Sequence, residues 1–291
     1  MHEETSDARH DVQGWHARLE LQFRHAQART VLTRRKHTGP LLVQRPFYPE
    51  CRAADNALMA GEPCHVYIIH PPGGVASGDE LQLDVELHPG SHALLTTPAA
   101  GKFYRRGAAG TARVTQTLRV DGAGLEWLPQ ENIFYPDAAV DLRSIVQLSS
   151  GARFIGWEIG CLGLPASGLT LAAGELRLGF ELWRDGRPLL VERLAIGAEA
   201  LSARWGMAGC AALGSALIYP AGPRELDLAR ATAQKDCTEL TLACTLVDGA
   251  LACRATARRP DHLKQAFVRV WQALRPALFG RQALPPRVWA T

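Results

Sequence analysis

Two glutamates, Glu158 and Glu192, stand in strand patterns where a carboxylate is unusual. Glu158 in "RFIGWEIG" shares its strand face with a phenylalanine and two glycines, and Glu192 in "PLLVERLAI" shares its face with three aliphatic residues. A buried carboxylate is costly unless it is paired, protonated or next to an internal wet space. For Glu192 alone the pattern favours a pair with a nearby arginine, although either glutamate could also face an internal polar route.

The stretch "HPPGGVASGDEL" combines three glycines with Asp79 ahead of a strand pattern. A phosphate-binding P-loop needs a lysine and a hydroxyl after its last glycine, whereas Asp79 and Glu80 follow Gly78 here and would repel phosphate. The next residues, "ELQLDVELH", alternate with period two, which is typical of a half-buried strand and not of the helix that follows a dinucleotide-binding loop. The stretch is therefore predicted to be a turn with Asp79 next to a strand.

Two further stretches place polar residues at the ends of apolar strands. "TTPAAGKFYRRG" begins with Thr96 and Thr97 and continues as a basic, aromatic loop. "LEWLPQENIFYPDA" has Glu126 and Trp127 on opposite faces of a strand, followed by Glu131 at a turn. Taken singly, each of these residues is more often structural than functional.

The histidines and cysteines form no recognisable metal motif. Five possible ligands are spread over strand patterns that point to different faces: Cys64, His65, His70, His88 and His92. A structural zinc site needs three or four converging ligands, so the sequence disfavours one. The seven cysteines include no C-x-x-C pair, which favours reduced and mostly buried thiols. No serine stands in a G-x-S-x-G motif, so a hydrolase triad is also disfavoured.

Composition is that of a globular protein with a sizeable core: 291 residues, 47% hydrophobic and 21% charged. No apolar run reaches the roughly 18 residues that a membrane span needs, so no membrane association is expected. The N-terminus, "MHEETSDARHD", is polar and acidic and does not resemble a secretory signal. The sequence thus predicts a cytoplasmic protein whose residues 1–14 are disordered.

Charge is unevenly distributed along the chain. The net charge is +3, but the segment from Arg254 to the end carries eight Arg or Lys and one Asp, hence +7, which leaves about −4 for the rest. This basic tail lacks a nucleic-acid-binding motif with interleaved aromatics. An acidic protein partner is the more natural expectation, and no nucleic-acid partner is predicted.

Strand patterns dominate, and about fifteen candidate strands are predicted. Asp121-Gly122, Asp185-Gly186 and Asp248-Gly249 each lie between apolar runs, which is a strong hairpin signal. Two helices are expected, at 223–234 and at 260–276. The second would have Asp261 as its N-cap, an apolar stripe through Phe267 and Trp271, and Pro276 as its stop. Residues 1–291 are predicted to form one all-β domain with a C-terminal helix.

The chain resembles the urease accessory protein UreD family, called UreH in some species. The similarity spans nearly the whole chain, is weakest over 197–220, and is carried in order by the following stretches: "WHARLELQF", "GPLLVQRPFYPE", "HPPGGVASGDEL", "LLTTPAAGKFYRR", "LEWLPQENIFYPDA", "CLGLPASG" and "FVRVWQALRPALFGRQALPPRVWAT". The resemblance implies an elongated, β-solenoid-like stack of strands with about two helices. It also implies a non-enzymatic role in installing the nickel centre of urease.

The same resemblance implies binding partners and a route for the metal. The expected partners are UreF, the GTPase UreG through UreF, and urease apoprotein. No cofactor is expected to be tightly bound, and Ni²⁺ would be in transit through an internal tunnel. The residues expected along the tunnel are Asp79, Thr96, Thr97, Glu131, Glu158 and Glu192. The residues expected to contact a partner are Phe267, Trp271 and Arg275.

A different class of protein remains an alternative. The chain could be a β-solenoid carbohydrate- or ester-active enzyme that uses two of Asp79, Glu126 and Glu131 as paired acids. Enzymes of that kind tend to carry exposed aromatics along an open groove, whereas aromatics are only 7% of this chain. Association with UreF and urease would favour the accessory role, and a sharp acid–base pH profile on a sugar polymer would favour the enzyme.

Overall fold

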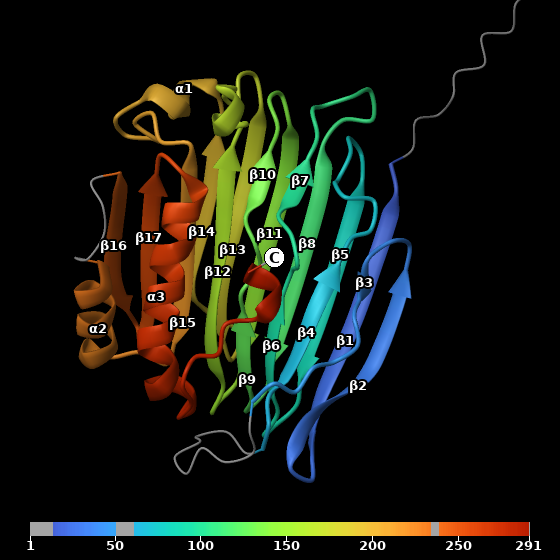
Figure 1. Ribbon diagram of the computed structural model, residues 1–291, viewed down its shortest axis with the longest axis vertical. Helices are drawn as coiled ribbons and strands as arrows, with labels where there is room; N and C mark the ends of the chain where they lie inside the picture. The colour runs from blue at the N-terminus through green and yellow to red at the C-terminus, as the bar shows by residue number, and fades with distance from the viewer. Residues whose placement is uncertain (1–13, 51–60, 234–238, 291) are drawn as a thin grey trace, which may run out of the picture.

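Two β-sheets pack face to face, and short polar turns connect strands of one sheet to strands of the other (Figure 1). The computed structural model describes residues 14–50, 61–233 and 239–290. The expectation of disorder for residues 1–14 lies, apart from Gly14, outside the described residues. None of the described helices is both long enough and apolar enough to cross a bilayer.

One sheet has seven strands. From edge to edge they are β14 (Arg187–Ile196), β13 (Glu175–Arg184), β11 (Ala139–Leu148), β8 (Ala112–Val120), β5 (Glu80–Leu87), β1 (His16–Ala26) and β2 (Arg29–Thr38).

The other sheet has ten strands. Its main path runs through β16 (Leu240–Val247), β17 (Ala250–Ala257), β15 (Ala212–Tyr219), β12 (Arg153–Leu162), β9 (Gly124–Trp127), β6 (His92–Thr96), β4 (Cys64–Ile69) and β3 (Leu42–Val43). Beside this path, β10 (Asn132–Phe134) pairs in parallel with both β12 and β7 (Gly101–Phe103).

The central strands form a parallel coil. The order β5, β6, β8, β9, β11, β12 alternates between the sheets, and β5–β8–β11–β13 and β4–β6–β9–β12 pair in parallel. The turns that connect the sheets stack on one another, since Gly90 N donates to Gly122 O and Gly122 N donates to Ser149 Oγ, each at 3.0 Å. The predicted all-β, solenoid-like stack is thereby confirmed.

Two of the three predicted Asp-Gly hairpins are correct. Asp185-Gly186 joins β13 to β14 and Asp248-Gly249 joins β16 to β17, and all four residues have positive φ, as a type I′ turn requires. The Asp121-Gly122 hairpin is wrong, because this turn connects β8 to β9 in the opposite sheet. In a stacked coil a tight turn can change sheet as well as reverse a strand, and flanking alternation looks the same in both cases.

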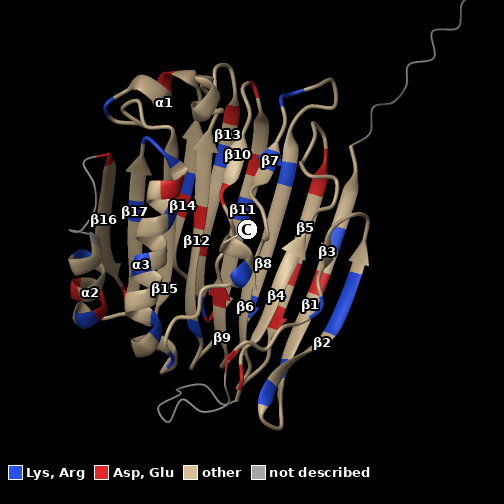
Figure 2. Cartoon of the chain, viewed as in Figure 1, with Lys and Arg blue, Asp and Glu red and all other residues tan. Residues whose placement is uncertain are grey.

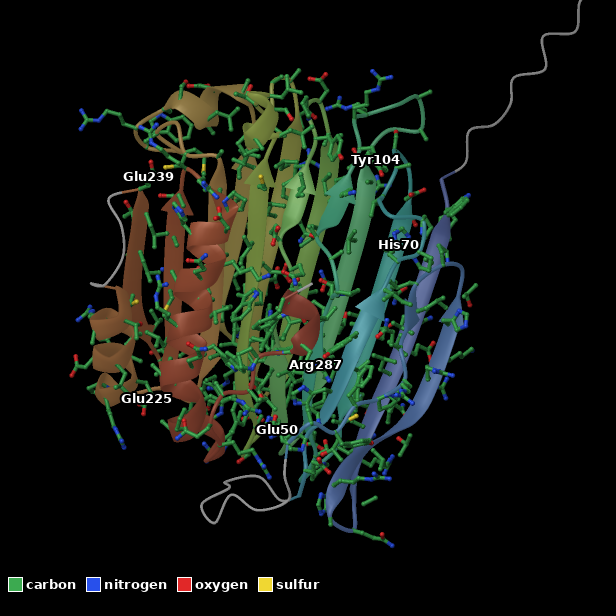
Figure 3. The ribbon with its side chains drawn as sticks, in the orientation of Figure 1. Glu50, His70, Tyr104, Glu225, Glu239 and Arg287 are labelled. Carbon is green, nitrogen blue, oxygen red and sulfur yellow. The ribbon has the colours of Figure 1, made fainter. Side chains whose placement is uncertain are left out.

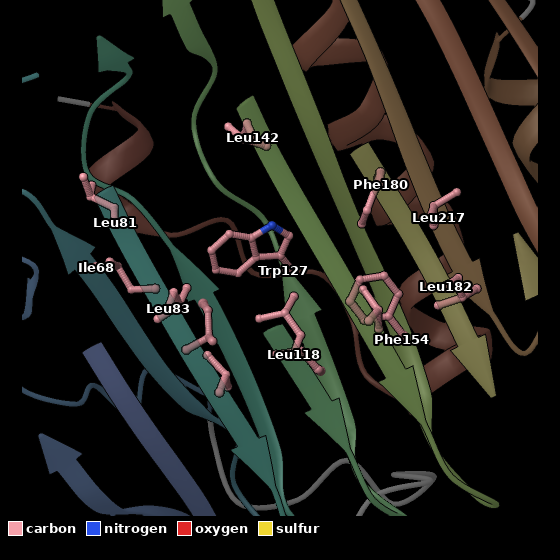
Figure 4. Packing of buried hydrophobic residues seen from close by; sticks show 14 of the residues in the cluster. Ile68, Leu81, Leu83, Leu118, Trp127, Leu142, Phe154, Phe180, Leu182 and Leu217 are labelled. Carbon is pink, nitrogen blue, oxygen red and sulfur yellow. The ribbon is translucent and has the colours of Figure 1, made fainter. Parts of the chain in front are cut away.

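Strand alternation sets the core. In β5 the side chains of Leu81, Leu83, Val85 and Leu87 are buried while their neighbours are less so. Figure 4 shows part of this core around Trp127 of β9, with side chains from both sheets. The space between the sheets is therefore lined mainly by aliphatic side chains.

Two helices, α2 (Pro223–Ala233) and α3 (Pro260–Phe279), cover the outer face of the ten-stranded sheet (Figure 1). A short helix that the sequence did not predict, α1 (Ala198–Ser202), follows β14 and contacts it. Short 3₁₀ turns are η1 (Pro165–Ser167) and η2 (Arg287–Ala290). The predicted bounds of α3 need correction: Arg259, not Asp261, is the N-cap, and the helix continues past Pro276 to Gly280 at φ 66°. Leu278 and Phe279 are buried, and their packing holds the last turn beyond the proline.

We expect Phe267→Ala to lower the free energy of unfolding by about 3–5 kcal/mol, because the Phe267 side chain is buried where α3 meets the sheet. Chemical denaturation measures the change. Gln272→Ala on the exposed side of the same helix is the matched control and should change stability by less than about 0.5 kcal/mol. Equal effects of the two variants would contradict the packing role of α3.

Candidate functional site

A cavity of about 550 Å³ lies between the two sheets. Three groups of residues line it. The seven-stranded sheet contributes Leu81, Leu83, Val114, Gln116 and Leu142. The ten-stranded sheet contributes Ile68, Trp127, Asn132 and Glu158, and connecting segments contribute others, including His70, Thr97 and Gln130. We call this space the large cavity; its lining is largely apolar, with a few polar groups. His70, labelled in Figure 3, lies on the connection that follows β4.

Glu158 is the buried carboxylate of the large cavity. Its Oε1 accepts hydrogen bonds from Ser144 Oγ at 2.6 Å and from Trp127 Nε1 at 2.9 Å. Its Oε2 is buried and has no hydrogen-bond partner among the described residues. Burial raises the pKa of Glu158, and the two hydrogen bonds only partly oppose this. The carboxyl group therefore has free capacity for a proton or a cation.

Glycines on either side of Glu158 make room for its surroundings. A Cβ at Gly156 would lie 2.8 Å from Trp127 Cβ and 2.5 Å from Phe154 Cζ, so only glycine lets the Trp127 ring reach Glu158. A Cβ at Gly160 would lie 3.0 Å from the Phe134 ring. The glycine-rich face of β12 is thus a requirement of close packing around the carboxylate.

A second cavity of about 40 Å³ adjoins the first. Asn132, Leu142 and Glu158 line both spaces, so the two meet at Glu158. At its other side the small cavity is lined by Glu192 and other residues of β14 and β15. Together the two spaces, which we call the inter-sheet passage, extend from the loop after β4 to the β14 edge of the seven-stranded sheet.

A buried charge network lies on the opposite, outer face of the ten-stranded sheet. Glu126 of β9 accepts hydrogen bonds from Arg275 Nε and Trp271 Nε1 of α3, at 2.9 and 2.6 Å, and from His92 Nε2 at 2.9 Å. All four side chains are fully buried. Burial alone would raise the pKa of Glu126, but the Arg275 guanidinium and His92 hold it below its usual range. This network fastens α3 to the centre of the sheet.

The network continues to Glu50, which is labelled in Figure 3. Arg275 Nη2 donates to Glu50 Oε1, and His65 Nε2 of β4 lies 2.8 Å from the same oxygen. Arg275 also donates to the backbone carbonyl of Gln282. One guanidinium thus joins α3 to β9, to the segment around Glu50 and to the chain that follows α3; we call these contacts the Arg275 clamp.

Comparisons with known proteins identify the family to which the chain belongs. A family model described as UreD urease accessory protein matches residues 16–290. The chain belongs to the UreD family. It is 43% identical over 292 residues to a urease accessory protein UreD of Pseudomonas putida (strain W619), with 99% of each chain covered. It is 40% identical to the UreD of Enterobacter sp. (strain 638), with 98% of each chain covered, and 40% identical to that of Klebsiella aerogenes, covering 96% of this chain and 97% of the relative.

Three of the six predicted path residues of this UreD-family chain line the passage, namely Thr97, Glu158 and Glu192. Thr97 Oγ1 accepts a hydrogen bond from Gln130 N at 2.9 Å. Glu192 pairs with Arg254, Nε to Oε1, at 2.5 Å, so the expected arginine partner exists even though the same carboxylate lines the small cavity.

The other three predicted path residues do not line the passage. Thr96 points to the outer face, where its Oγ1 donates to Leu128 O at 2.6 Å and accepts from Trp289 Nε1 at 2.9 Å. Asp79 accepts the backbone N–H groups of Trp15 and Ala76, at 2.8 and 2.7 Å, and so fixes the turn. Glu131 is half-buried on the turn after β9 and is absent from the lining of both cavities. These assignments to the path are therefore corrected.

The predicted partner contacts also need correction. Phe267, Trp271 and Arg275 are buried within the chain, with at most 1% of each side chain exposed, and none offers surface to a partner. An apolar stripe indicates that a helix buries one face. In α3 that face is buried against the ten-stranded sheet. The stripe packs on the body of the protein.

The basic C-terminal segment is not one open surface. Arg275 is buried, Arg254 pairs with Glu192, and Arg259 pairs with Asp261 at 2.8 Å. Figure 2 shows the basic residues of α3 interspersed with other residues, whereas β2 carries a longer basic stretch. The net charge of +7 counted along the sequence therefore overstates the positive charge that this segment exposes at the surface.

Sequence reasoning missed several residues of the site. Gln116 Oε1 is buried without a partner among the described residues and faces the large cavity. Ser144 and Asn132 were also missed, although a serine on the apolar face of "AVDLRSIVQL" was a usable signal. Arg254 was seen only as part of the basic tail. Over 14–50, 61–233 and 239–290 no three His, Cys, Asp or Glu side chains form a group able to hold a metal ion.

The acids considered as catalytic residues of an enzyme lie in different parts of the structure. Glu126 lies under α3 in the Arg275 clamp, and Asp79 fixes the turn from Ala76 to Asp79 directly before β5. Each is committed to other donors, so neither is one of two facing carboxylates in an open groove.

Replacing Arg275 with methionine should lower the free energy of unfolding by about 3–5 kcal/mol, because it leaves Glu126 and Glu50 buried without their cation. Urea denaturation measures this, with Arg259→Met on the exposed ion pair as control. Combining Arg275→Met with Glu126→Gln should recover part of the loss. A loss unchanged by the second substitution would contradict a charge-based clamp.

The clamp also predicts a pH dependence of stability. Burial lowers the pKa of His92 below 6.5 despite Glu126, so below about pH 6.5 the unfolded state binds a proton that the native state does not. Stability should therefore fall on acidification, with this histidine contributing about 1 kcal/mol between about pH 7 and about pH 5.5. His92→Gln, which keeps a donor for Glu126, should show a correspondingly smaller loss in denaturation curves at the two pH values. An unchanged slope would show that His92 binds protons equally in the folded and unfolded states, and so would contradict the lowered pKa.

Proposed function

We propose that this UreD-family chain serves in the maturation of urease as a scaffold and a nickel conduit, between a complex of UreF with the GTPase UreG and the urease apoprotein. Its role is non-catalytic and is carried out in the cytoplasm. Family membership supports the link to urease maturation. The single observation that carries the conduit role is the inter-sheet passage, with Glu158 where its two cavities meet.

The chemistry of the passage suits an ion in transit. Nickel binds imidazole and thiolate tightly, and a closed set of such ligands would retain it. The passage offers instead a few separated oxygens, from Glu158, Gln116, Asn132 and Thr97, and the imidazole of His70, which do not form a closed set. Separated oxygen ligands can hold a hydrated cation briefly and release it again.

The apolar lining supports passage of the ion with its water shell. A bare dication in an apolar space would lose solvation worth tens of kcal/mol, which a single carboxylate does not replace. The large cavity, at about 550 Å³, has room for an ion with coordinated water. The unpartnered oxygens of Glu158 and Gln116 could then accept hydrogen bonds from that water.

Replacing Thr97 with tryptophan should obstruct the large cavity while leaving the outer surface unchanged. Nickel content and urease activity after co-expression with the urease subunits and accessory proteins should fall about tenfold, equivalent to about 1.4 kcal/mol on the limiting step. Co-purification with UreF and urease should persist.

Two controls separate obstruction from damage. Thr97→Ser keeps the hydroxyl that accepts from Gln130 N and should behave as wild type. Thr115→Trp places the same bulk on an exposed position of β8 and should also leave nickel content and urease activity unchanged. Normal nickel content with Thr97→Trp would contradict the conduit role, and loss of complex formation would show that Thr97 is structural.

A further inference from the structure

One ion pair joins the two sheets at the edge where the inter-sheet passage ends. Glu192 belongs to β14, the last strand of the seven-stranded sheet, and Arg254 belongs to β17 of the ten-stranded sheet. Arg254 Nε lies 2.5 Å from Glu192 Oε1. The pair therefore spans the space between the sheets rather than lying along one of them.

The pair lies beside the small cavity. Glu192 lines that cavity together with Leu194 and Ser215. Ser215 is directly opposite Arg254 in the antiparallel pairing of β15 with β17. The seven-stranded sheet ends at β14, while the ten-stranded sheet continues through β17 to β16. Arg254 thus holds its charge at the open edge, on the solvent side of the cavity.

The two partners differ in freedom. The Glu192 side chain is only 10% exposed, whereas that of Arg254 is 48% exposed. An exposed arginine in an ion pair is held weakly, by about 1 kcal/mol or less, and can turn into solvent. The Glu192 carboxylate lies on the inner face of its strand and cannot turn into solvent with the arginine. If the pair separates, Glu192 stays at the cavity and Arg254 leaves.

We propose that Arg254 is the gate of the inter-sheet passage at this edge and that Glu192 is the carboxylate it covers. While paired, the guanidinium neutralises Glu192 and places a positive charge in the way of a cation. A divalent cation that arrives at Glu192 competes for the carboxylate and displaces the arginine. This inference rests on the proposed function only in taking the cargo to be a cation.

Charge-selective thiol labelling tests the gate on the full chain. Ser215→Cys places a thiol in the small cavity, and its labelling rate is measured by peptide mass spectrometry with two reagents of similar size. One is the cationic aminoethyl methanethiosulfonate and the other the neutral methyl methanethiosulfonate. In each case the thiolate attacks the reagent sulfur, a disulfide forms, and methanesulfinate leaves.

Adding Arg254→Gln should raise the ratio of cationic to neutral labelling about fivefold, since it leaves one uncompensated carboxylate near the path. Adding Glu192→Gln as well should return the ratio to its starting value. Arg193→Gln on the same edge strand removes an arginine that pairs with Glu181 instead, and it should leave the ratio unchanged. The rise should persist in the presence of Thr97→Trp, which closes the far end.

An unchanged ratio with Arg254→Gln would overturn the gate, and the ion pair would then be only a link between the sheets. A rise that Thr97→Trp abolishes would also overturn it, because the reagent would be entering from the other end. The conduit is judged separately by nickel content with Thr97→Trp. A changed ratio with normal nickel content would retain the gate and reject the conduit.

Discussion

The centre of the ten-stranded sheet, at β6, β9 and β12, is buried on both faces, and the rest of the structure depends on this constraint. Because successive side chains of a strand point to opposite faces, neighbouring residues enter different environments. In β9, Glu126 enters the Arg275 clamp while Trp127 lines the passage. In β12, Trp157 donates to Pro129 O on the helix side while Glu158 faces the passage. The clamp and the passage are thus built from alternate residues of the same strands.

This arrangement couples α3 to a passage that no residue of α3 lines. Burial of the outer face fixes the backbone of β9 and β12, and that backbone positions Trp127 and Glu158. A shift of one residue in register would exchange Glu126 with Trp127 and place a carboxylate in an apolar core. Replacing a buried ion pair with well-packed apolar residues is often neutral or stabilising, so we expect the pair of Arg275 with Glu126 to contribute mainly by specifying this register.

Much of the fold could be predicted from the sequence, because alternation, Asp-Gly turns and the apolar stripe of α3 are local signals. The site was only partly predictable. Glu158 and Glu192 stood out because a carboxylate on an apolar strand face is unusual. Thr96 was assigned to the path with Thr97 because both end the same strand, and a local pattern cannot say which face becomes the inner one. Arg254 could not be matched to Glu192, since the two lie 62 positions apart on strands of different sheets.

The same alternation affects how loss of partner binding would be interpreted. Phe267, Trp271 and Arg275 are buried in the chain, so a substitution there acts on a partner only through the sheet beneath. A loss of UreF binding together with stability would therefore not identify α3 as a contact. Exposed positions on the same helix, such as Gln265 and Gln272, separate the two causes, because they can alter a contact without disturbing the Arg275 clamp. A surface effect confined to such positions would place a partner over α3, whereas effects confined to buried positions would place it elsewhere.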